Sequence, residues 1–572
     1  MPIEPSVSER RVAEAIVDAL AEADIRFVVG MPGGHTGTIF GALHDHPSIR
    51  VVQVREESIG STMAEAYGRY RGRPIVVMGQ GEWIAGNAGQ GFMEAHLGCA
   101  PMLILTDLTD GGVLSHHAPY QSGSADYGTW DTRQTLAGMT KRVMVSLHPA
   151  QAVQHVQLGL KHAMTGEPGP VAVVFHTSAL RGRVQPGTPP LLYPTDRYLP
   201  RPSRAVDVEA LESAARTLEG AQRPVIIAGN GVRVGQATAA LAALAETLDA
   251  PVATTASGKG VFDERDVRAA GVIGSFGAPA ANALVGESDV ILAIGTKLGP
   301  HDTANEHTAL LDPSRQSLIQ IDVEPLNAGW TFPVDHSLIG DAGFLMQRLG
   351  DAVAGGAGSG RVGAGERVAG FAERDGRDAP AFETDEVPFH PQRLIRVLEE
   401  SFPEEGVLST DAGENRLFMM HWYRSRGGGR YLQPAAGGGM GYAIPAAMGA
   451  KLADPDRPVL AICGDGGFAM SLHAIMSAVQ EEIPIAVLVF NNGALGWVLH
   501  GMGEKAVAAN FAKFDHEAIA HALGCDGVRV SSTSELRAAI ESVSKLTRPL
   551  VIDVPLSLET SFQDVSQTFD AH

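Results

Sequence analysis

Cysteine is scarce in this sequence, and its three copies lie far apart. Cys99, Cys463 and Cys525 provide neither a disulfide framework nor the ligand spacing of a metal cluster. Two of them lie in or next to apolar, strand-like runs. This usage of cysteine is typical of a reducing compartment, so we expect a cytoplasmic protein.

Positive charge is also in short supply. The chain has 44 Lys and Arg residues against 65 Asp and Glu residues, which gives a formal net charge of −21. Such a chain has little that would attract phosphate backbones, so nucleic acids and anionic membranes are not expected as partners. A small anionic substrate is compatible with this charge only if the site itself is locally positive.

Long apolar runs are missing as well. No run approaches the length of a membrane-spanning helix, and the N-terminal segment MPIEPSVSERRVAEAI has no apolar core like that of a signal peptide. We therefore expect a soluble protein. The 572 residues are 44% hydrophobic and include 67 Gly and 34 Pro, which fits several large α/β domains with many turns.

Short apolar runs alternate with amphipathic stretches along the chain, which predicts an α/β protein with three doubly wound parallel-sheet domains. The first domain is expected over residues 1–184 and the central domain over 204–350, with a Pro-rich connector between them. A Gly-rich, low-complexity stretch over 354–370 precedes the third domain, which is expected over 385–560. The first and third domains share a strand–loop–helix rhythm, as expected of two versions of one module.

The stretch Gly464–Trp497 of the third domain carries the clearest chemical pattern. An apolar run, Val459–Cys463, leads into a Gly-rich turn that contains Asp465, and a second apolar run, Ile485–Phe490, leads to Asn492. A parallel crossover places the ends of both strands on one edge of the sheet. We therefore expect Asp465 and Asn492 to meet at that edge.

A carboxylate and an amide oxygen together form a hard but incomplete oxygen site. Such a site suits a divalent cation that completes its shell with phosphate oxygens. The glycines Gly466 and Gly467 would let backbone N–H groups approach those phosphates, and the N-terminus of the following helix would favour their charge. The alternative is an ordinary strand-to-helix turn with a capping Asp, which the Asn after the second strand makes less favoured.

This arrangement resembles the signature of thiamine diphosphate enzymes, in which GDG is followed at a distance by NN. The resemblance implies that Mg²⁺ is bound by the side chains of Asp465 and Asn492 and by the backbone carbonyl of Ala494. The family's usual Ser after GDG is Gly467 here, which removes a hydroxyl but keeps the backbone donors. The resemblance also implies that several residues of this stretch contact the cofactor, namely Gly464, Gly466, Gly467, Asn492 and Leu495.

Further segments resemble the same family in the right order over nearly the whole chain, most closely the acetolactate synthase, benzaldehyde lyase and 2-oxoacid decarboxylase group. Val54–Tyr67 is similar to RHEQGAAHMADGYA, which places the family's catalytic Glu on Glu57, with Glu56 replacing the His. A carboxylate buried against the ring nitrogen of the cofactor is held partly protonated and shares its proton with that ring, which then generates the ylid. The alternatives are a solvated Glu in the first helical turn and a shift of the role to Glu56.

Two segments of the third domain complete the resemblance. Gly438–Ala447 is similar to GTMGYGLPAA, which implies that Met440 wedges between the two cofactor rings and that the Gly438 carbonyl accepts from the exocyclic amine. A core Met at a helix start is the alternative. Thr410–Asn415 is similar to TDVGQHQ, so diphosphate contacts are implied for Gly413, Glu414 and Asn415. Glu414 replaces the usual Gln and would put an anion near phosphate.

The substrate side is expected to involve His35, Gln80 and a pair of histidines. His35 lies in GGHTGTIFGAL, much like the GAHIDTIFQA segment of benzaldehyde lyase, and could shuttle protons near neutral pH; a loop His bonded to backbone is the alternative. His116 and His117 resemble the pair of pyruvate and indolepyruvate decarboxylases, although their flanks differ, so surface histidines remain an alternative. Gln80 lies in GQG, where the family often has GPG, and could point at the substrate.

Two departures from the family narrow the function. Acetohydroxyacid synthases carry GMVxQW after the Asn pair, whereas here the Trp position falls on Gly501, which weakens a branched-chain biosynthetic role. The central domain keeps TTASGKG over Thr254–Gly260. However, Gly295–Asp302 lacks the RFDDR-like run of the flavin-containing members, so FAD is not expected.

The resemblance therefore implies an enzyme that depends on thiamine diphosphate and Mg²⁺ and acts on a small carbonyl substrate. We expect carboligase or lyase chemistry on 2-oxoacids, 2-hydroxyketones or diketones, with simple 2-oxoacid decarboxylation as the alternative. A catalytically silent homologue is a further alternative, against which the retention of Glu57, Asp465 and Asn492 argues. The resemblance also implies a homodimer or homotetramer with active sites between subunits.

Overall fold

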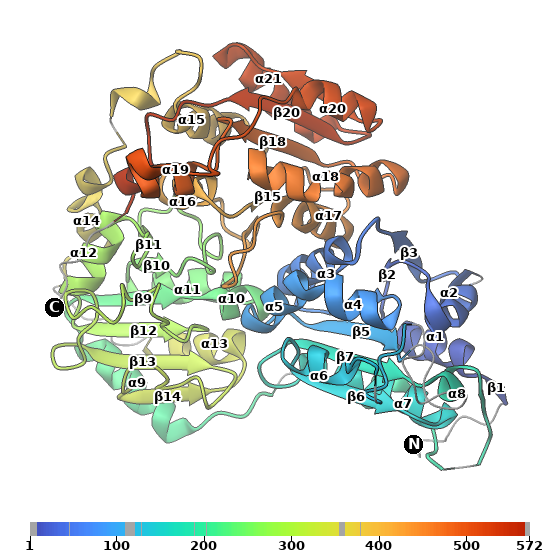
Figure 1. The fold of residues 1–572 in the computed structure, drawn as a ribbon. Helices are drawn as coiled ribbons and strands as arrows, with labels where there is room; N and C mark the ends of the chain where they lie inside the picture. The colour runs from blue at the N-terminus through green and yellow to red at the C-terminus, as the bar shows by residue number, and fades with distance from the viewer. Residues whose placement is uncertain are drawn as a thin grey trace. The chain divides into compact units, whose positions relative to one another are not determined.

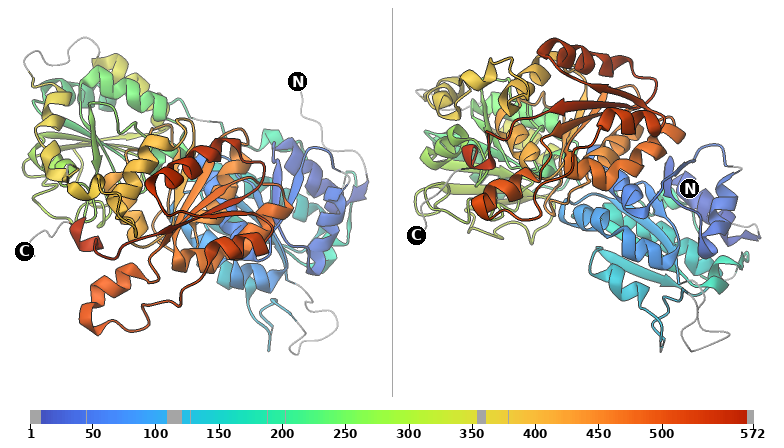
Figure 2. Two further views of the ribbon diagram at one scale, coloured as in Figure 1. Left: turned by 90° about the horizontal axis from the view of Figure 1, so that it is seen from above. Right: turned by 45° about the horizontal axis from the view of Figure 1, so that its top comes forward.

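Three parallel sheets of six strands each form the framework of the described chain (Figure 1). Helices flank these sheets on both faces (Figure 2), and every neighbouring pair of strands within them is parallel. The prediction of three doubly wound parallel sheets is confirmed, whereas the predicted domain boundaries stay a prediction. The structure is a computed structural model that describes residues 9–44, 46–108, 121–126, 128–187, 189–201, 203–353, 361–377 and 379–566.

The chain forms two compact units. The first consists of the residues up to Arg201 with two short pieces, Met448–Ala453 and Met476–Glu481, and the second consists of the remaining residues. The first unit contains one of the six-stranded sheets, and the second contains the other two. None of the described helices is long and apolar enough to cross a membrane.

The sheet of the first unit is built around strands that are buried along their whole length. The residues of β5 (Met102–Asp107) and β7 (Pro170–Phe175) are all buried, as expected for central strands covered by helices on both sides. The strands in spatial order are β3 (Arg50–Gln53), β2 (Phe27–Gly30), β4 (Val76–Met78), β5 (Met102–Asp107), β7 (Pro170–Phe175) and β6 (Arg142–Ser146). A separate antiparallel pair is formed by β1 (Arg10–Arg11) and β8 (Arg183–Val184).

Local sequence signals explain where the helices of the first unit begin. Asp131 caps α6 by accepting the N–H of Gln134 at 2.8 Å, and α7 has Pro149 at a first-turn position, where a missing N–H costs nothing. The helices are α1 (Val12–Glu22), α2 (Gly37–His44), α3 (Glu57–Arg71), α4 (Gly81–Asn87), α5 (Gly89–Leu97), α6 (Thr132–Ala137), α7 (Pro149–Met164) and α8 (Thr177–Leu180).

The central sheet lies in the second unit. Its helix α9 is capped by Asp207, which accepts the N–H of Ala210 at 3.1 Å, and α9 packs its apolar face into the core. The strands in spatial order are β11 (Ala269–Val272), β10 (Val252–Thr254), β9 (Pro224–Ala228), β12 (Val290–Ile294), β13 (Ser317–Asp322) and β14 (His336–Ile339). The helices are α9 (Val208–Gly220), α10 (Asn230–Val234), α11 (Thr238–Leu248), α12 (Pro279–Glu287), α13 (Ala342–Val353) and α14 (Ala364–Ala369).

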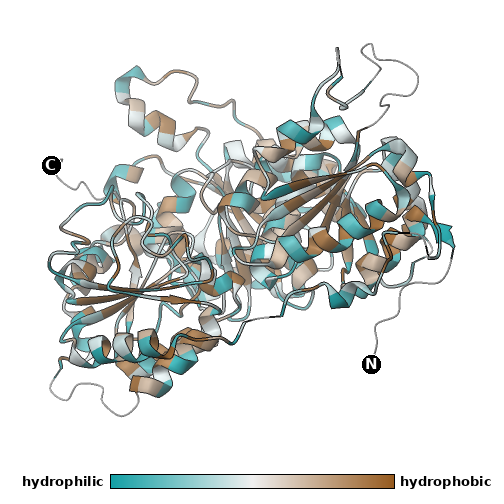
Figure 3. Cartoon of the chain, turned by 90° about the horizontal axis from the view of Figure 1, so that it is seen from below, coloured by the Kyte–Doolittle hydropathy of each residue, from teal (hydrophilic) through white to brown (hydrophobic). Residues whose placement is uncertain are grey.

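The third sheet has the same architecture, and its apolar strands appear brown between the helices in Figure 3. The strands in spatial order are β16 (Tyr431–Leu432), β15 (Val407–Thr410), β17 (Val459–Gly464), β18 (Ala486–Asn491), β20 (Leu550–Pro555) and β19 (Asp526–Arg529). The helices are α15 (Pro391–Ser401), α16 (Glu414–Trp422), α17 (Ala443–Ala453), α18 (Asp465–Gln480), α19 (Gly496–Met502), α20 (His516–Ala522) and α21 (Thr533–Ser542).

Short 3₁₀ helices lie in the connections of both units. They are η1 (Gly34–Thr36), η2 (Thr195–Arg197), η3 (Ala372–Asp375), η4 (Pro380–Phe382), η5 (Gly503–Lys505), η6 (Val543–Lys545) and η7 (Phe562–Asp564). The first of these holds His35, and the last lies in the C-terminal segment of the second unit. Both therefore bear on the candidate site.

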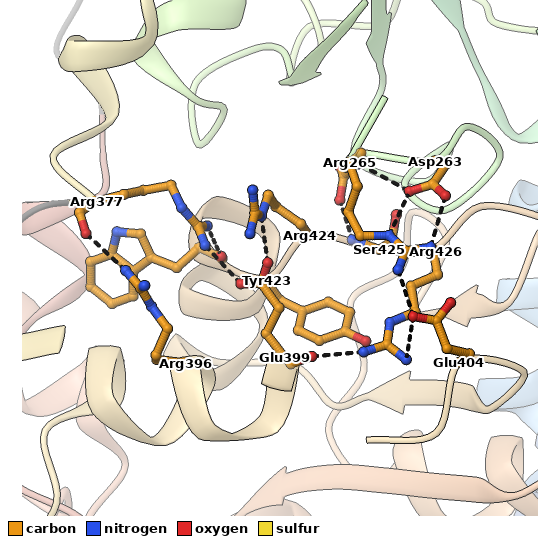
Figure 4. Close-up of polar contacts among 12 residues, drawn as sticks. Asp263, Arg265, Arg377, Arg396, Glu399, Glu404, Tyr423, Arg424, Ser425 and Arg426 are labelled. Atoms are coloured by element: carbon orange, nitrogen blue, oxygen red, sulfur yellow. Dashed lines mark hydrogen bonds and ion pairs between the residues drawn. The ribbon is translucent and has the colours of Figure 1, made fainter. Parts of the chain in front are cut away.

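Polar contacts within the second unit join the loop before β11 to the segments after α15 and α16 (Figure 4). Arg265 pairs with Glu404 at 2.7 Å, and the N–H of Ser425 donates to Glu264 at 2.6 Å. Lys259 is buried; its Nζ lies 2.6 Å from the carboxylate of Glu264 in the same loop and donates to the carbonyl oxygen of Tyr423 at 2.7 Å. The loops of the central sheet and the third sheet are therefore tied by both exposed and buried charges.

Candidate active site

The ends of β17 and β18 bring the two predicted metal ligands together. The two strands are parallel, with Gly464 opposite Phe490, and Asp465 begins α18 directly after β17. Oδ2 of Asp465 accepts the backbone N–H groups of Asn492 and Gly493, each at 3.0 Å. Asp465 and Asn492 therefore meet at one edge of the sheet.

The side chains of Asp465 and Asn492 offer oxygen atoms as metal ligands, the type of ligand that a magnesium ion prefers. Burial raises the pKa of Asp465, and its Oδ1 lies 3.6 Å from Nε2 of His516. Oδ1 of Asn492 accepts the N–H of Ala494 at 3.1 Å. Among the described residues no group of three His, Cys, Asp or Glu side chains could hold a metal, so a cation here would need further oxygen ligands from a bound molecule.

Gly466 lies where two predicted cofactor residues converge. A Cβ on Gly466 would come within 2.5 Å of Cε of Met440 and 2.9 Å of Cδ2 of Leu495. The structure therefore gathers Met440, Leu495 and the Gly-rich turn beside Asp465. Glycine at this position leaves room between those side chains and the backbone of the turn.

Asp411 is a buried residue of this site to which the sequence analysis gave no role. Its carboxylate accepts the N–H groups of Gly441 at 2.9 Å and Ala443 at 3.0 Å, and burial raises its pKa to about 6. A Cβ on Gly467 would lie 2.8 Å from Cγ of Asp411. The Asp411 carboxylate thus occupies space beside Gly467 and holds the backbone that follows Met440.

The loop before α16 contains the residues predicted to contact the diphosphate. Gly413 has a φ of +101°, a conformation that L side chains rarely adopt, so the turn requires glycine. The side chain of Asn415 donates to the carbonyl of Ala412 at 2.8 Å, whereas its buried Oδ1 makes no hydrogen bond within the described part of the chain. The loop therefore presents backbone N–H groups and a buried acceptor at the first turn of a helix.

Glu414 turns its carboxylate towards α19 and the C-terminal segment. Its Oε1 lies 2.6 Å from Nδ1 of His500 and accepts the N–H of Phe562 at 2.8 Å. A Cβ on Gly496 would lie 2.1 Å from its Oε2. Burial raises the pKa of Glu414, while the contact with His500 lowers it. The sequence analysis did not find His500, whose partner lies 86 positions away.

Aromatic side chains cluster in the second unit, and Arg416 lies beside the Gly438 loop of the same unit. The ring of Trp497 stacks on Phe562 with centroids 4.8 Å apart and meets Phe276 edge-on at 5.4 Å. Arg416 donates to Oε1 of Gln433 at 3.2 Å, and its Nη1 would lie 3.8 Å from a Cβ on Gly438. Arg416 is thus a positive charge next to the loop predicted to contact the cofactor's amine.

The first unit holds the remaining predicted residues. Glu57 begins α3 and is buried, and Nδ2 of Asn87 donates to its Oε2 at 3.0 Å. Glu56 instead caps α3 by accepting the N–H of Ser58 at 3.1 Å. The two neighbouring carboxylates therefore have different surroundings, and Asn87 is a partner of Glu57 that the sequence analysis missed.

His35 and Gln80 lie in loops that converge on Asp107. Oδ2 of Asp107 accepts the N–H of His35 at 2.6 Å, and Oδ1 accepts the N–H of Gly81 at 3.0 Å. Gln80 donates to Gln121 at 2.8 Å. The structure thus brings the His35 and Gln80 loops together at the carboxyl end of β5, whereas His116 and His117 lie outside the described residues.

Comparison with known proteins gives matches along the chain. Family models of thiamine pyrophosphate enzymes match in three parts: the N-terminal TPP binding domain over residues 10–125, the central domain over 211–349 and the C-terminal TPP binding domain over 411–554.

Similar curated proteins come from several organisms. A probable acetolactate synthase large subunit of Methanocaldococcus jannaschii is 27% identical over 95% of this chain and 91% of its own length. The acetolactate synthase large subunit of Corynebacterium glutamicum is 28% identical, over 95% and 86%. A sulfoacetaldehyde acetyltransferase of Castellaniella defragrans is 27% identical, over 97% and 94%.

Proposed function

Because the chain belongs to the thiamine pyrophosphate-dependent enzymes, we propose that it makes or breaks carbon–carbon bonds next to a carbonyl group, in the manner of an acetolactate synthase. The observation that carries the proposal is the meeting of Asp465 with Asn492 at the paired ends of β17 and β18, beside Met440 and Leu495. The substrates are 2-oxoacids, 2-hydroxyketones or diketones.

The second unit supplies the groups that would hold thiamine diphosphate and Mg²⁺. The side chains of Asp465 and Asn492 and the carbonyl of Ala494 would bind the cation, and the turn around Gly413 would contact the diphosphate through backbone N–H groups. When bound, the cofactor supplies a nucleophilic carbon that adds to the carbonyl of the substrate and takes up the electrons of the broken bond. Met440 would hold the two rings of the cofactor in a bent arrangement.

In the first unit, Glu57 is the candidate for the proton that is exchanged with the cofactor ring. It is buried, and Asn87 fixes one of its two carboxylate oxygens at 3.0 Å. The other oxygen would then face the ring nitrogen. The neighbouring loops around His35 and Gln80 are candidates for substrate contacts. A homodimer or homotetramer whose subunits share active sites follows from the family likeness as part of the same proposal.

Arg416 supports a substrate that carries an acid group. The chain has a net charge of −21, so a small anion needs a local positive charge, and Arg416 provides one next to Gly438. The aromatic side chains of Phe276, Trp497 and Phe562 form an apolar cluster in the same unit. The positive charge of Arg416 favours 2-oxoacids over uncharged diketones as substrates.

The proposal is tested by following products from pyruvate by proton NMR, with purified protein, thiamine diphosphate and Mg²⁺, and with Glu57→Gln alongside. Acetolactate or acetoin formed by the parent and not by the variant supports carboligation. Acetaldehyde as the sole product would make the protein a simple decarboxylase. Cofactor binding without any turnover of pyruvate, acetoin or diacetyl would contradict the proposed activity and favour a catalytically silent homologue.

Sulfoacetaldehyde belongs in the same assay, because similar proteins carry the name sulfoacetaldehyde acetyltransferase. Its consumption in place of pyruvate would keep the cofactor chemistry and change the substrate. Arg416→Gln is the matching variant. The account predicts a higher KM for any acidic substrate in this variant, with the affinity for thiamine diphosphate unchanged.

A further inference from the structure

Glu414 places a carboxylate directly after the loop that is proposed to hold the diphosphate. It is the first residue of α16, its side chain is buried, and the missing side chain of Gly496 leaves the space that its Oε2 occupies. An uncompensated buried carboxylate at this point would repel a bound phosphate and would itself be costly. The loop therefore needs a group that removes the charge of Glu414.

His500 has the geometry to remove that charge. Its Nε2 lies 3.0 Å from the carbonyl oxygen of Leu558, and because a carbonyl only accepts, Nε2 carries a hydrogen. Its Nδ1 lies 2.6 Å from Oε1 of Glu414, a distance that requires a second proton between the two atoms. Whichever atom holds that proton, the Glu414–His500 pair has no net charge.

The C-terminal segment fixes this pair from the other side. The N–H of Phe562 donates to the same Oε1 at 2.8 Å, and the ring of Phe562 stacks on Trp497, which neighbours Gly496 in α19. Asp564 of the same segment is another anion close enough to raise the pKa of Glu414. His500 thus balances the charge of Glu414, next to which Asp564 adds a second anion.

We propose that His500 is a positioning residue for thiamine diphosphate: by neutralising Glu414, it makes an anionic residue compatible with the diphosphate at the first turn of α16. The inference rests on the proposed cofactor site and assigns a role to two side chains of this chain. In this proposal, the Glu414–His500 pair takes the place of the neutral Gln that is usual in the family at the position of Glu414. His500 acts on the cofactor through Glu414 and through the loop that precedes Glu414.

A double-mutant cycle tests this role by cofactor affinity, measured by calorimetry with Mg²⁺ present, and so does not depend on turnover. The variants are His500→Gln, Glu414→Gln and the pair of both. We expect His500→Gln to weaken thiamine diphosphate binding by about tenfold or more, because a unit charge then remains near phosphate. Glu414→Gln should bring the double variant back to within about threefold of the parent.

The control is another His–Glu pair in the same unit. Nε2 of His521 lies 4.0 Å from Glu517 on the exposed face of α20, so His521→Gln should leave cofactor affinity unchanged. Thermal unfolding without cofactor reports whether each variant folds. His500→Asn replaces His500→Gln in the cycle if the latter fails to fold.

Three results would overturn the inference. Equal losses for His500→Gln in the parent and Glu414→Gln backgrounds would mean that His500 acts only through Leu558. Unchanged affinity in His500→Gln would mean that the charge of Glu414 does not reach the cofactor. Failure of the parent itself to bind thiamine diphosphate would remove the proposed function together with the inference.

Discussion

Two glycines of the helix α19 differ in what surrounds them. A Cβ on Gly496 would lie 2.1 Å from Oε2 of Glu414, whereas the nearest atom to a Cβ on Gly501 is 3.8 Å away, in the ring of Phe562. Gly496→Ala should therefore displace the Glu414 carboxylate and lower the free energy of unfolding by about 1–3 kcal/mol. Gly501→Ala should be neutral or slightly stabilising. Urea denaturation of both variants checks this, and equal effects would contradict it.

Asn87 is expected to matter to turnover more than to cofactor binding. It donates to Oε2 of Glu57 at 3.0 Å, and its loss would let that carboxylate rotate away from the ring nitrogen. Asn87→Ala should lower kcat by about tenfold, and Asn87→Asp should lower it further, because a second carboxylate would face Glu57. Steady-state kinetics with cofactor titrations separate the two effects. A change in cofactor affinity with kcat intact would contradict the assignment.

Asp411 gives the cofactor-free protein a pH-dependent stability. Burial raises its pKa from the usual 3.8 to about 6, so the folded state binds this proton more tightly than the unfolded state. Stability should therefore fall as the pH rises from about 4 to about 6, by up to roughly 3 kcal/mol. Asp411→Asn should remove this part of the slope in denaturant unfolding. An identical slope in parent and variant would show that Asp411 does not titrate in this range.

At the scale of elements, a buried ion pair within the loop before β11 holds that loop to the segment after α16, because Nζ of Lys259 donates to the carbonyl oxygen of Tyr423 at 2.7 Å and Glu264 accepts the N–H of Ser425 at 2.6 Å. Lys259 and Glu264 lie 2.6 Å apart, and both side chains are buried. Removing one partner leaves the other as a buried, unpaired charge, so Lys259→Ala should lower the free energy of unfolding by about 3–5 kcal/mol.

The exposed pair of Arg348 with Asp351 in α13 provides the comparison, and Arg348→Ala should change that free energy by about 0.5 kcal/mol or less. The midpoints of urea unfolding measure both variants. A Lys259→Ala variant as stable as the parent would show that the pair adds nothing to the joining of these elements.

The strands β17 and β18 show why the fold could be predicted from the sequence. Apolar runs such as Val459–Cys463 end at glycine-rich turns, and the right-handed parallel crossover then leaves little freedom in where the strand ends lie. The meeting of Asp465 and Asn492 follows from that rule alone. Both residues lie at positions where the chain direction changes, which a linear sequence makes visible.

Other contacts of the candidate site could not be found in this way. Glu414 and His500 lie 86 positions apart, Glu57 and Asn87 lie 30 apart, and the contact of Asp107 with the His35 loop spans 72. These pairings depend on side-chain directions and on packing between loops, which no local pattern encodes. Asp411 lay within a recognised segment, but only its three-dimensional surroundings reveal that it holds the backbone after Met440.

At the scale of the whole molecule, a chain with a net charge of −21 has to hold a phosphorylated cofactor. Backbone N–H groups at the turn around Gly413, the neutral Glu414–His500 pair and a cation held by Asp465 and Asn492 would offset the repulsion locally. Binding should therefore depend on the divalent cation. Added salt should have less effect than removal of Mg²⁺, because the balancing charges are partly buried.

The measurement that tests the central claim most directly is a calorimetric titration of thiamine diphosphate into the parent and into Asp465→Ala, with Mg²⁺ and again with EDTA. The account predicts binding to the parent with Mg²⁺, and its loss or severe weakening both with EDTA and in the variant. Equally tight binding in all four titrations would contradict the claim that the edge formed by β17 and β18 holds the cofactor through a metal ion.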